Sequence, residues 1–164
     1  MSSNSDLYDI DVYAWSQAQA ALLDGKRWDA LDIANLIEEI LSVGASQYTA
    51  VSSAVYHIMV HLLKWRYQPA RQSHSWRVSL VEHRSRIPRR LRHAPLLARE
   101  IPTMIEEEYR AACRKASAQT GLPLATFPEV YPWDVVQVLD EDFWPEPAEA
   151  GPGVQHLGGC EQDK

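Results

Sequence analysis

The chain is poor in cysteine and has no long apolar run. Its 164 residues include two cysteines, Cys113 and Cys160, too few and too far apart for the disulfide framework of a small secreted domain. The first six residues lack the basic start and apolar core of a signal peptide, and no apolar stretch approaches the roughly 18 residues that span a bilayer. We therefore expect a cytoplasmic protein that makes no membrane contact.

Recognisable catalytic motifs are also missing. The sequence has no Gly-rich phosphate loop, no Gly-x-Ser-x-Gly elbow and no Cys-x-x-Cys pair. Cys113 falls on an apolar helix face, where a thiol is expected to be inert. Glu38 and Glu39 point in adjacent directions, so they are not a ready-made pair of catalytic carboxylates. These absences favour a non-catalytic protein that needs no cofactor.

What the sequence has is helical periodicity. Apolar residues recur every three or four positions in five segments, and Asp134 is expected to cap a short sixth helix. The predicted helices span residues 9–24, 29–43, 46–67, 73–91, 95–119 and 135–139. Over 122–132, prolines alternate with apolar residues, which predicts an extended segment packed across the helices. The domain is expected to span 1–146, followed by a flexible Gly/Pro-rich tail over 147–164.

Glycines and prolines mark the expected breaks between helices. Gly25 and Gly44 are expected to end the first two helices, which would make the first three helices antiparallel neighbours. Pro88 is expected to kink or split the fourth helix, and Pro102 to interrupt the fifth. The predicted fold is an all-α antiparallel bundle of about five to six helices with a Pro-rich extended C-terminal segment.

The net charge of −6 hides a strong segregation along the chain. Residues 1–63 carry eight acids and two bases, and residues 100–164 carry thirteen acids and four bases. Between them, 64–99 carry ten bases against the single acid Glu82. Such a stretch indicates either an anionic partner or internal neutralisation, for example by the glutamates at 106–108. For a chain with pI near 5.5 the internal explanation is preferred, and nucleic-acid binding is disfavoured.

The stretch 64–77 joins the third and fourth predicted helices and intersperses aromatic rings with basic side chains. Arginine offers a fork of donors and stacks on rings, and a helix beginning at Ser73 or Ser75 would add N–H groups suited to an anion. The same residues also fit a structural explanation, in which the cations stabilise a helix C-terminus and the tryptophans join two helices. The candidate ligand-binding residues are Lys64, Trp65, Tyr67, Arg71, Ser75, Trp76 and Arg77.

His57 and His61 lie one helical turn apart, a spacing at which two imidazoles can share a metal ion. In a hairpin folded at Gly44, Asp32 would lie level with His57 and could complete a metal site. Asp32 is also an expected helix cap. Histidines that are partly buried and hydrogen-bonded are the simpler interpretation, so the metal site is kept as an alternative.

Six runs of the sequence resemble the domain-of-unknown-function 29 family. They lie at 8–15 (YDIDVYAW), 35–40 (NLIEEI), 61–69 (HLLKWRYQP), 75–77 (SWR), 120–123 (TGLP) and 132–143. The resemblance covers roughly residues 6–146, and its Leu-Leu-Lys-Trp-x-Tyr-Gln-Pro run is the most specific part. It implies an all-helical bundle of bacterial type, with no established activity and no functional residue to transfer. Pro88 and Pro102 depart from the more continuous helices of the family.

The leading hypothesis is a non-catalytic binding module that uses the basic and aromatic stretch 64–77. Its expected partner is an acidic protein or a small anionic ligand, and the sequence is also compatible with an oligomer. The first alternative is a metal-dependent or hydrolytic enzyme that uses His57 and His61. The second alternative is a nucleic-acid-binding protein.

Overall fold

The computed structural model describes residues 4–148, so all but the first two residues of the predicted tail at 147–164 lie outside the described residues. All regular structure in the described part is helical, which confirms the all-α prediction. The α-helices are α1 (Asn4–Ile10), α2 (Val12–Asp24), α3 (Ile33–Tyr67), α4 (His74–Leu91), α5 (Ile101–Thr120) and α6 (Val135–Leu139). Short 3-10 helices span Trp28–Ala30, Pro69–Arg71, Pro95–Arg99 and Leu124–Thr126.

The predicted break at Gly44 is wrong. A single helix, α3, runs for 35 residues through this position, so the second and third predicted helices do not form a hairpin. Glycine favours a helix end because it readily adopts a positive φ, and Gly121, which closes α5, is the one described glycine with that conformation. Gly44 has no such conformation. A glycine inside a helix costs only about 1 kcal/mol relative to alanine, which the packing of the rest of α3 can offset.

The remaining breaks differ from expectation at Asp11, Pro88 and Pro102. The first predicted helix is divided, because the side chain of Asp11 accepts a hydrogen bond from Ala14 N and caps α2. Pro88 lies in the last turns of α4 and does not split it. Pro102 lies in the first turn of α5, where a missing N–H costs nothing, so it marks the start of the helix. Gly25 ends α2 as predicted.

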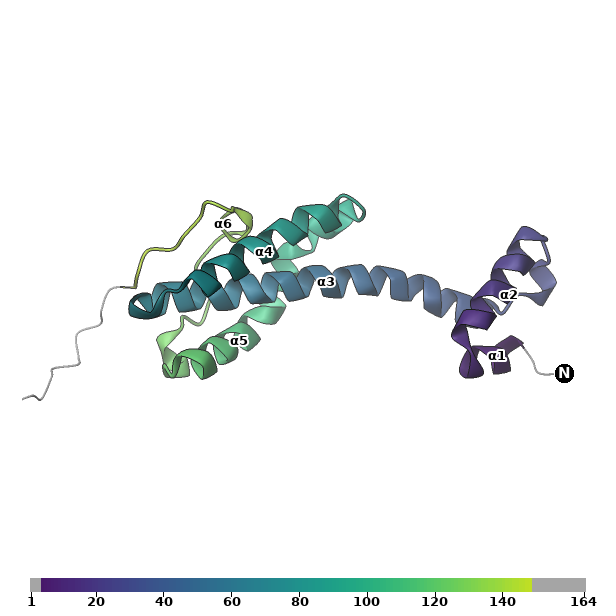
Figure 1. The fold of residues 1–164 in the computed structure, drawn as a ribbon, viewed down its shortest axis with the longest axis horizontal. Coiled ribbons are helices and arrows are strands. Elements are labelled where there is room, and N and C mark those ends of the chain that lie inside the picture. The colour runs from purple at the N-terminus through teal and green to yellow at the C-terminus, as the bar shows by residue number, and fades with distance from the viewer. Residues whose placement is uncertain (1–3, 149–164) are drawn as a thin grey trace, which may run out of the picture.

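The core forms around the C-terminal half of α3. In Figure 1, α4 and α5 lie along this half of α3, and α1 and α2 lie at its opposite end. Side chains of α3, α4 and α5 meet in the core, among them Val55, Leu62, Leu80 and Met104. Phe127 and Trp133, in and just after the Pro-rich segment, are buried against this core. Asp134 caps α6 with a full capping box, which confirms the short last helix.

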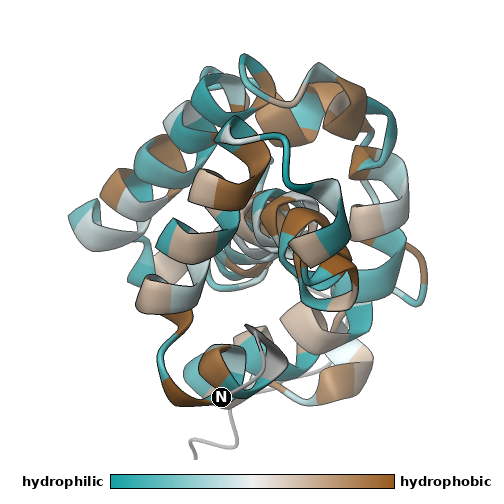
Figure 2. Ribbon diagram, turned by 90° about the vertical axis from the view of Figure 1, so that its right-hand side faces the viewer, coloured by the Kyte–Doolittle hydropathy of each residue, from teal (hydrophilic) through white to brown (hydrophobic). Residues whose placement is uncertain are grey.

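The molecule therefore has two parts. We call residues 48–148 the body and residues 4–47 the arm. The arm consists of the N-terminal part of α3 and a hook formed by α1 and α2. Figure 2 views the molecule from the hook end and shows hydrophobic ribbon, coloured brown, in the helices nearest the viewer. The arm is thus not a conventional polar extension.

Candidate functional site

The stretch 64–77 forms a junction where α3 ends and α4 begins. Its inner end is Lys64, which is only 6% exposed although it carries a charge. Lys64 Nζ donates a hydrogen bond to Gln119 Oε1 at 2.9 Å and lies 4.3 Å from the centroid of the Trp76 ring. Burial is the main cause that lowers the pKa of Lys64. Lys64 and Trp76 therefore hold α3, α4 and α5 together.

The aromatic side chains of the junction bind the C-terminal segment. Trp65 packs on Trp144 with ring centroids 4.6 Å apart, and Tyr67 meets Phe127 edge-to-face at 5.3 Å. Arg66 O accepts a hydrogen bond from Ala148 N at 2.9 Å, which fixes the same segment through the backbone. Both rings therefore pack on the C-terminal segment, and Trp65 contacts that segment where the sequence predicted a contact between two helices.

The outward half of the junction consists of Arg71, Ser75 and Arg77, which are all exposed. Ser73 caps α4 by accepting a hydrogen bond from Trp76 N, and its hydroxyl also lies 2.9 Å from that of Ser75. The Arg77 guanidinium lies 5.1 Å from the centroid of the Trp144 ring, a cation–π distance. These three candidates are exposed, whereas the other four are buried or half-buried, and Ser75 and Arg77, two residues apart, point about 200° apart around α4.

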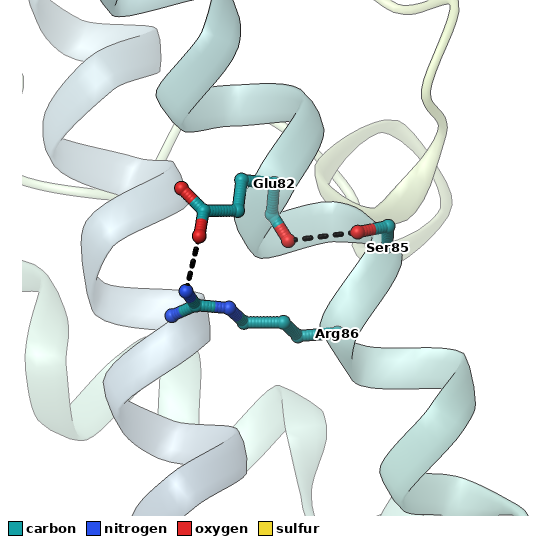
Figure 3. A network of polar contacts seen from close by, with 3 residues as sticks. All are labelled: Glu82, Ser85 and Arg86. Atoms are coloured by element: carbon teal, nitrogen blue, oxygen red, sulfur yellow. Dashed lines mark hydrogen bonds and ion pairs between the residues drawn. The ribbon is translucent and has the colours of Figure 1, made fainter.

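Internal carboxylates do not neutralise these arginines. Within residues 4–148 the recorded ion pairs are Arg27–Asp29 and Arg86–Glu82. Figure 3 shows the second pair within α4, beside the hydrogen bond from Ser85 Oγ to the Glu82 carbonyl. The glutamates at 106–108 do not pair with α4: Glu107 accepts a hydrogen bond from Tyr48, and Glu108 accepts one from Ser52. Among the described residues, Arg86 is therefore the one base of the stretch 64–99 with a recorded ion pair, and the glutamates at 106–108 do not neutralise the stretch.

One arginine of this stretch is structural, and sequence analysis missed its role. Arg84 is 1% exposed and donates hydrogen bonds to three backbone carbonyls, those of Gln137, Val138 and Phe143, at 2.9–3.1 Å. Two of these carbonyls belong to α6, whose last carbonyls lack helical partners. Arg84 therefore fixes the C-terminal segment on α4. No local sequence pattern indicates this role, because it depends on where the C-terminal segment crosses α4.

The two histidines of the alternative site lie between α3 and α4, with a third one. His57 stacks on His83 with ring centroids 4.7 Å apart, and His61 follows one turn later on α3. Burial is the main cause that lowers the pKa of each histidine, and that of His61 falls to about 4. Asp32 does not join them: it caps α3, 25 residues and about 37 Å from His57 along the helix axis.

The metal site predicted with Asp32 is therefore not formed. In the part of the chain that the structure describes, no three His, Cys, Asp or Glu side chains are arranged to hold a metal ion. Asp32 instead accepts a hydrogen bond from Trp15 Nε1 at 3.2 Å, and its backbone N–H donates to Gln19 Oε1 at 2.9 Å. Its role is to attach the hook to the start of α3.

Comparison with known families decides where the chain belongs. The model of the domain of unknown function DUF29 matches residues 7–144, which is most of the chain. The chain belongs to the DUF29 family. No curated protein and no solved structure matches this DUF29 protein. None of its described helices is long and apolar enough to cross a membrane.

Proposed function

We propose that this DUF29 protein is a non-catalytic interaction module that binds an acidic partner through Arg71, Ser75 and Arg77. The observation that carries the proposal is the division of the junction into two halves. The inner half fixes the C-terminal segment, and the outer half presents two guanidinium groups that no described carboxylate pairs. The planar guanidinium group of arginine can donate two parallel hydrogen bonds to the oxygens of a carboxylate or phosphate group.

The rigidity of the surface supports recognition rather than a loose electrostatic contact. Ser73 begins α4 with a side-chain cap, and Arg77 follows in the first turn of that helix. The Trp144 ring beneath Arg77 packs in turn on Trp65. A guanidinium that is held over a ring loses less freedom on binding than one on a mobile loop, so more of its interaction energy contributes to affinity.

The enzyme alternative has less support. It requires an acid beside His57 and His61, and the continuous α3 separates Asp32 from both. His61 is partly buried with a pKa near 4, so it is uncharged at neutral pH and a weak base. The packing of these rings between α3 and α4 accounts for them without a reaction.

The test uses the double variant Arg71→Glu/Arg77→Glu, with Arg110→Glu/Arg114→Glu on α5 as the matched control. Both pairs are exposed, and both change the net charge by the same amount. The probe is a fluorescent glutamate-rich peptide, with inorganic phosphate and a DNA duplex in parallel titrations. We expect the peptide to bind wild type and control equally and the junction variant at least tenfold more weakly, with circular dichroism unchanged.

The other outcomes of this titration would each count against the proposal. Equal loss in the control would show a general charge effect and contradict the proposal. Unchanged peptide binding by a folded junction variant would also contradict it. Preference for the DNA duplex, with retention that falls steeply with salt, would favour the nucleic-acid alternative.

A further inference from the structure

The apolar stripe of α3 does not stop where its packing partners stop. Ile33, Ile37, Ile40 and Leu41 are 53–68% exposed, although they are large and apolar. A helix turns by about 100° per residue, so Ile40 and Val51 point within about 20° of each other. Val51 begins the fully buried part of the same stripe. The arm therefore continues the core face of α3 without a cover.

The hook does not cover this stripe. It attaches through Tyr8, whose hydroxyl donates to Glu39 Oε1 at 2.7 Å, and through the contacts of Trp15 and Gln19 with Asp32. Glu39 lies two residues beyond Ile37, about 200° away around the helix. The hook thus occupies a polar side of α3, and the apolar side remains open.

The exposed large apolar residues are concentrated in the arm. Of the sixteen exposed large hydrophobic residues recorded within 4–148, ten lie in the arm: Ile10, Val12, Tyr13, Leu23, Trp28, Ile33, Ile37, Ile40, Leu41 and Val43. Burial of one such side chain is worth about 1.5–3 kcal/mol, which at about 25 cal/mol per Å² corresponds to about 60–120 Å². The five on α3 expose on the order of 250 Å², about a third of the roughly 800 Å² per partner in a stable complex, so the apolar stripe alone does not account for a stable pair.

The charges of the arm and of the adjacent body are complementary, which favours a second copy of the chain as the partner. Residues 4–47 carry eight acids and two bases, a net charge of −6. Where the arm meets the body, Arg86, Arg89, Arg90, Arg92 and His93 line a hollow of about 500 Å³ together with Gln47. Arg90 also donates a hydrogen bond to Gln47 Oε1 at 3.3 Å. Each copy therefore carries an acidic apolar arm with a basic cluster at its base.

We propose that two copies of the chain pair antiparallel through the open stripe of α3. With Ile40 on the two-fold axis, Ile33 of each copy lies level with Gln47 of the other copy. The acidic outer end of each arm then lies level with the arginine cluster of the other copy. A parallel pair would instead bring the two acidic ends together, where like charges repel.

The first test is the mass of the full chain in solution, measured by light scattering on a sizing column. We expect twice the chain mass of 18.6 kDa at about 100 µM, a concentration chosen to populate even a weak dimer. Ile37→Glu/Ile40→Glu should give a folded monomer. Val130→Glu/Val136→Glu, at exposed apolar positions of the body, should leave the dimer intact.

A wild-type monomer, a larger assembly, or a dimer that survives Ile37→Glu/Ile40→Glu would each overturn the proposal. Orientation is tested by disulfide formation in a Cys160→Ser background, since Cys113 is buried. A mixture of Ile33→Cys and Gln47→Cys chains should crosslink as a heterodimer, whereas Ile33→Cys alone should not. Efficient crosslinking of Ile33→Cys with itself would mean a parallel pair and contradict the antiparallel arrangement.

Discussion

His57 and His83 stack across the boundary between α3 and α4, with their ring planes inclined by only 13°. The groups facing them are His61, Lys64 and Lys115 on α3 and α5, and Arg86 and Glu82 on α4. Apart from Glu82, these groups are basic. Burial first, and then the nearby cations, lower the pKa of both stacked rings.

We expect the free energy of unfolding to fall as the pH drops from 6.5 to 4. The folded pKa of His61, near 4, lies below its unfolded value of 6.5, so the unfolded chain takes up the proton first in this range. A shift of this size corresponds to about 3 kcal/mol at most. Urea titrations at several pH values should show a smaller pH dependence for His61→Leu than for wild type. An equal dependence would contradict the assignment, and the exposed His74 provides the control as His74→Ala.

Replacement of Arg84 should destabilise the protein more than any other arginine substitution in α4. Arg84→Leu leaves one buried and two partly buried carbonyls without their donor, and an unpaired buried group costs about 1–3 kcal/mol. We expect a loss on the order of 3 kcal/mol in urea unfolding. Arg89→Leu, at an exposed position, should stay within about 0.5 kcal/mol of wild type. Similar effects of the two substitutions would show that Arg84 does not fix the C-terminal segment.

Alanine should have opposite effects at two glycines. At Gly44 an added Cβ meets no atom within 4 Å, and the backbone is helical, so Gly44→Ala should stabilise the protein by about 0.5–1 kcal/mol. At Gly121, where φ is +75°, Gly121→Ala should destabilise it by about 1 kcal/mol. Thermal unfolding measures both. A destabilising Gly44→Ala would mean that this position forms a turn after all.

The periodicity of apolar residues predicts most of the helices. The predicted helix end at Gly44 is wrong because it rests only on the frequency of glycine at such ends. The apolar stripe keeps its phase across this position, however: Ile40 and Val51 are eleven residues apart, which is three turns plus about 20°. A hairpin would not need to keep that phase. The continuity of α3 was therefore readable from the sequence.

The candidate site was predicted as one surface, and it is two. The position of Arg71 and Arg77 follows from the turn between α3 and α4, which proline and serine specify locally. The roles of Trp65 and Tyr67 depend on Trp144 and Phe127, which are far away in the chain. The path of the Pro-rich segment sets these contacts, and periodicity carries no information about it.

The course of α3 through Gly44 is the central claim, because the open stripe and the separation of Asp32 from the histidines both depend on it. Spin labels at Ala34→Cys and Ser53→Cys, two exposed positions of α3, measure it directly in a Cys160→Ser background. Dilution with unlabelled protein removes distances between copies. A continuous helix predicts about 29 Å between the two Cα atoms, whereas a hairpin at Gly44 would bring them to about 10 Å. A dominant distance near the shorter value would contradict the account.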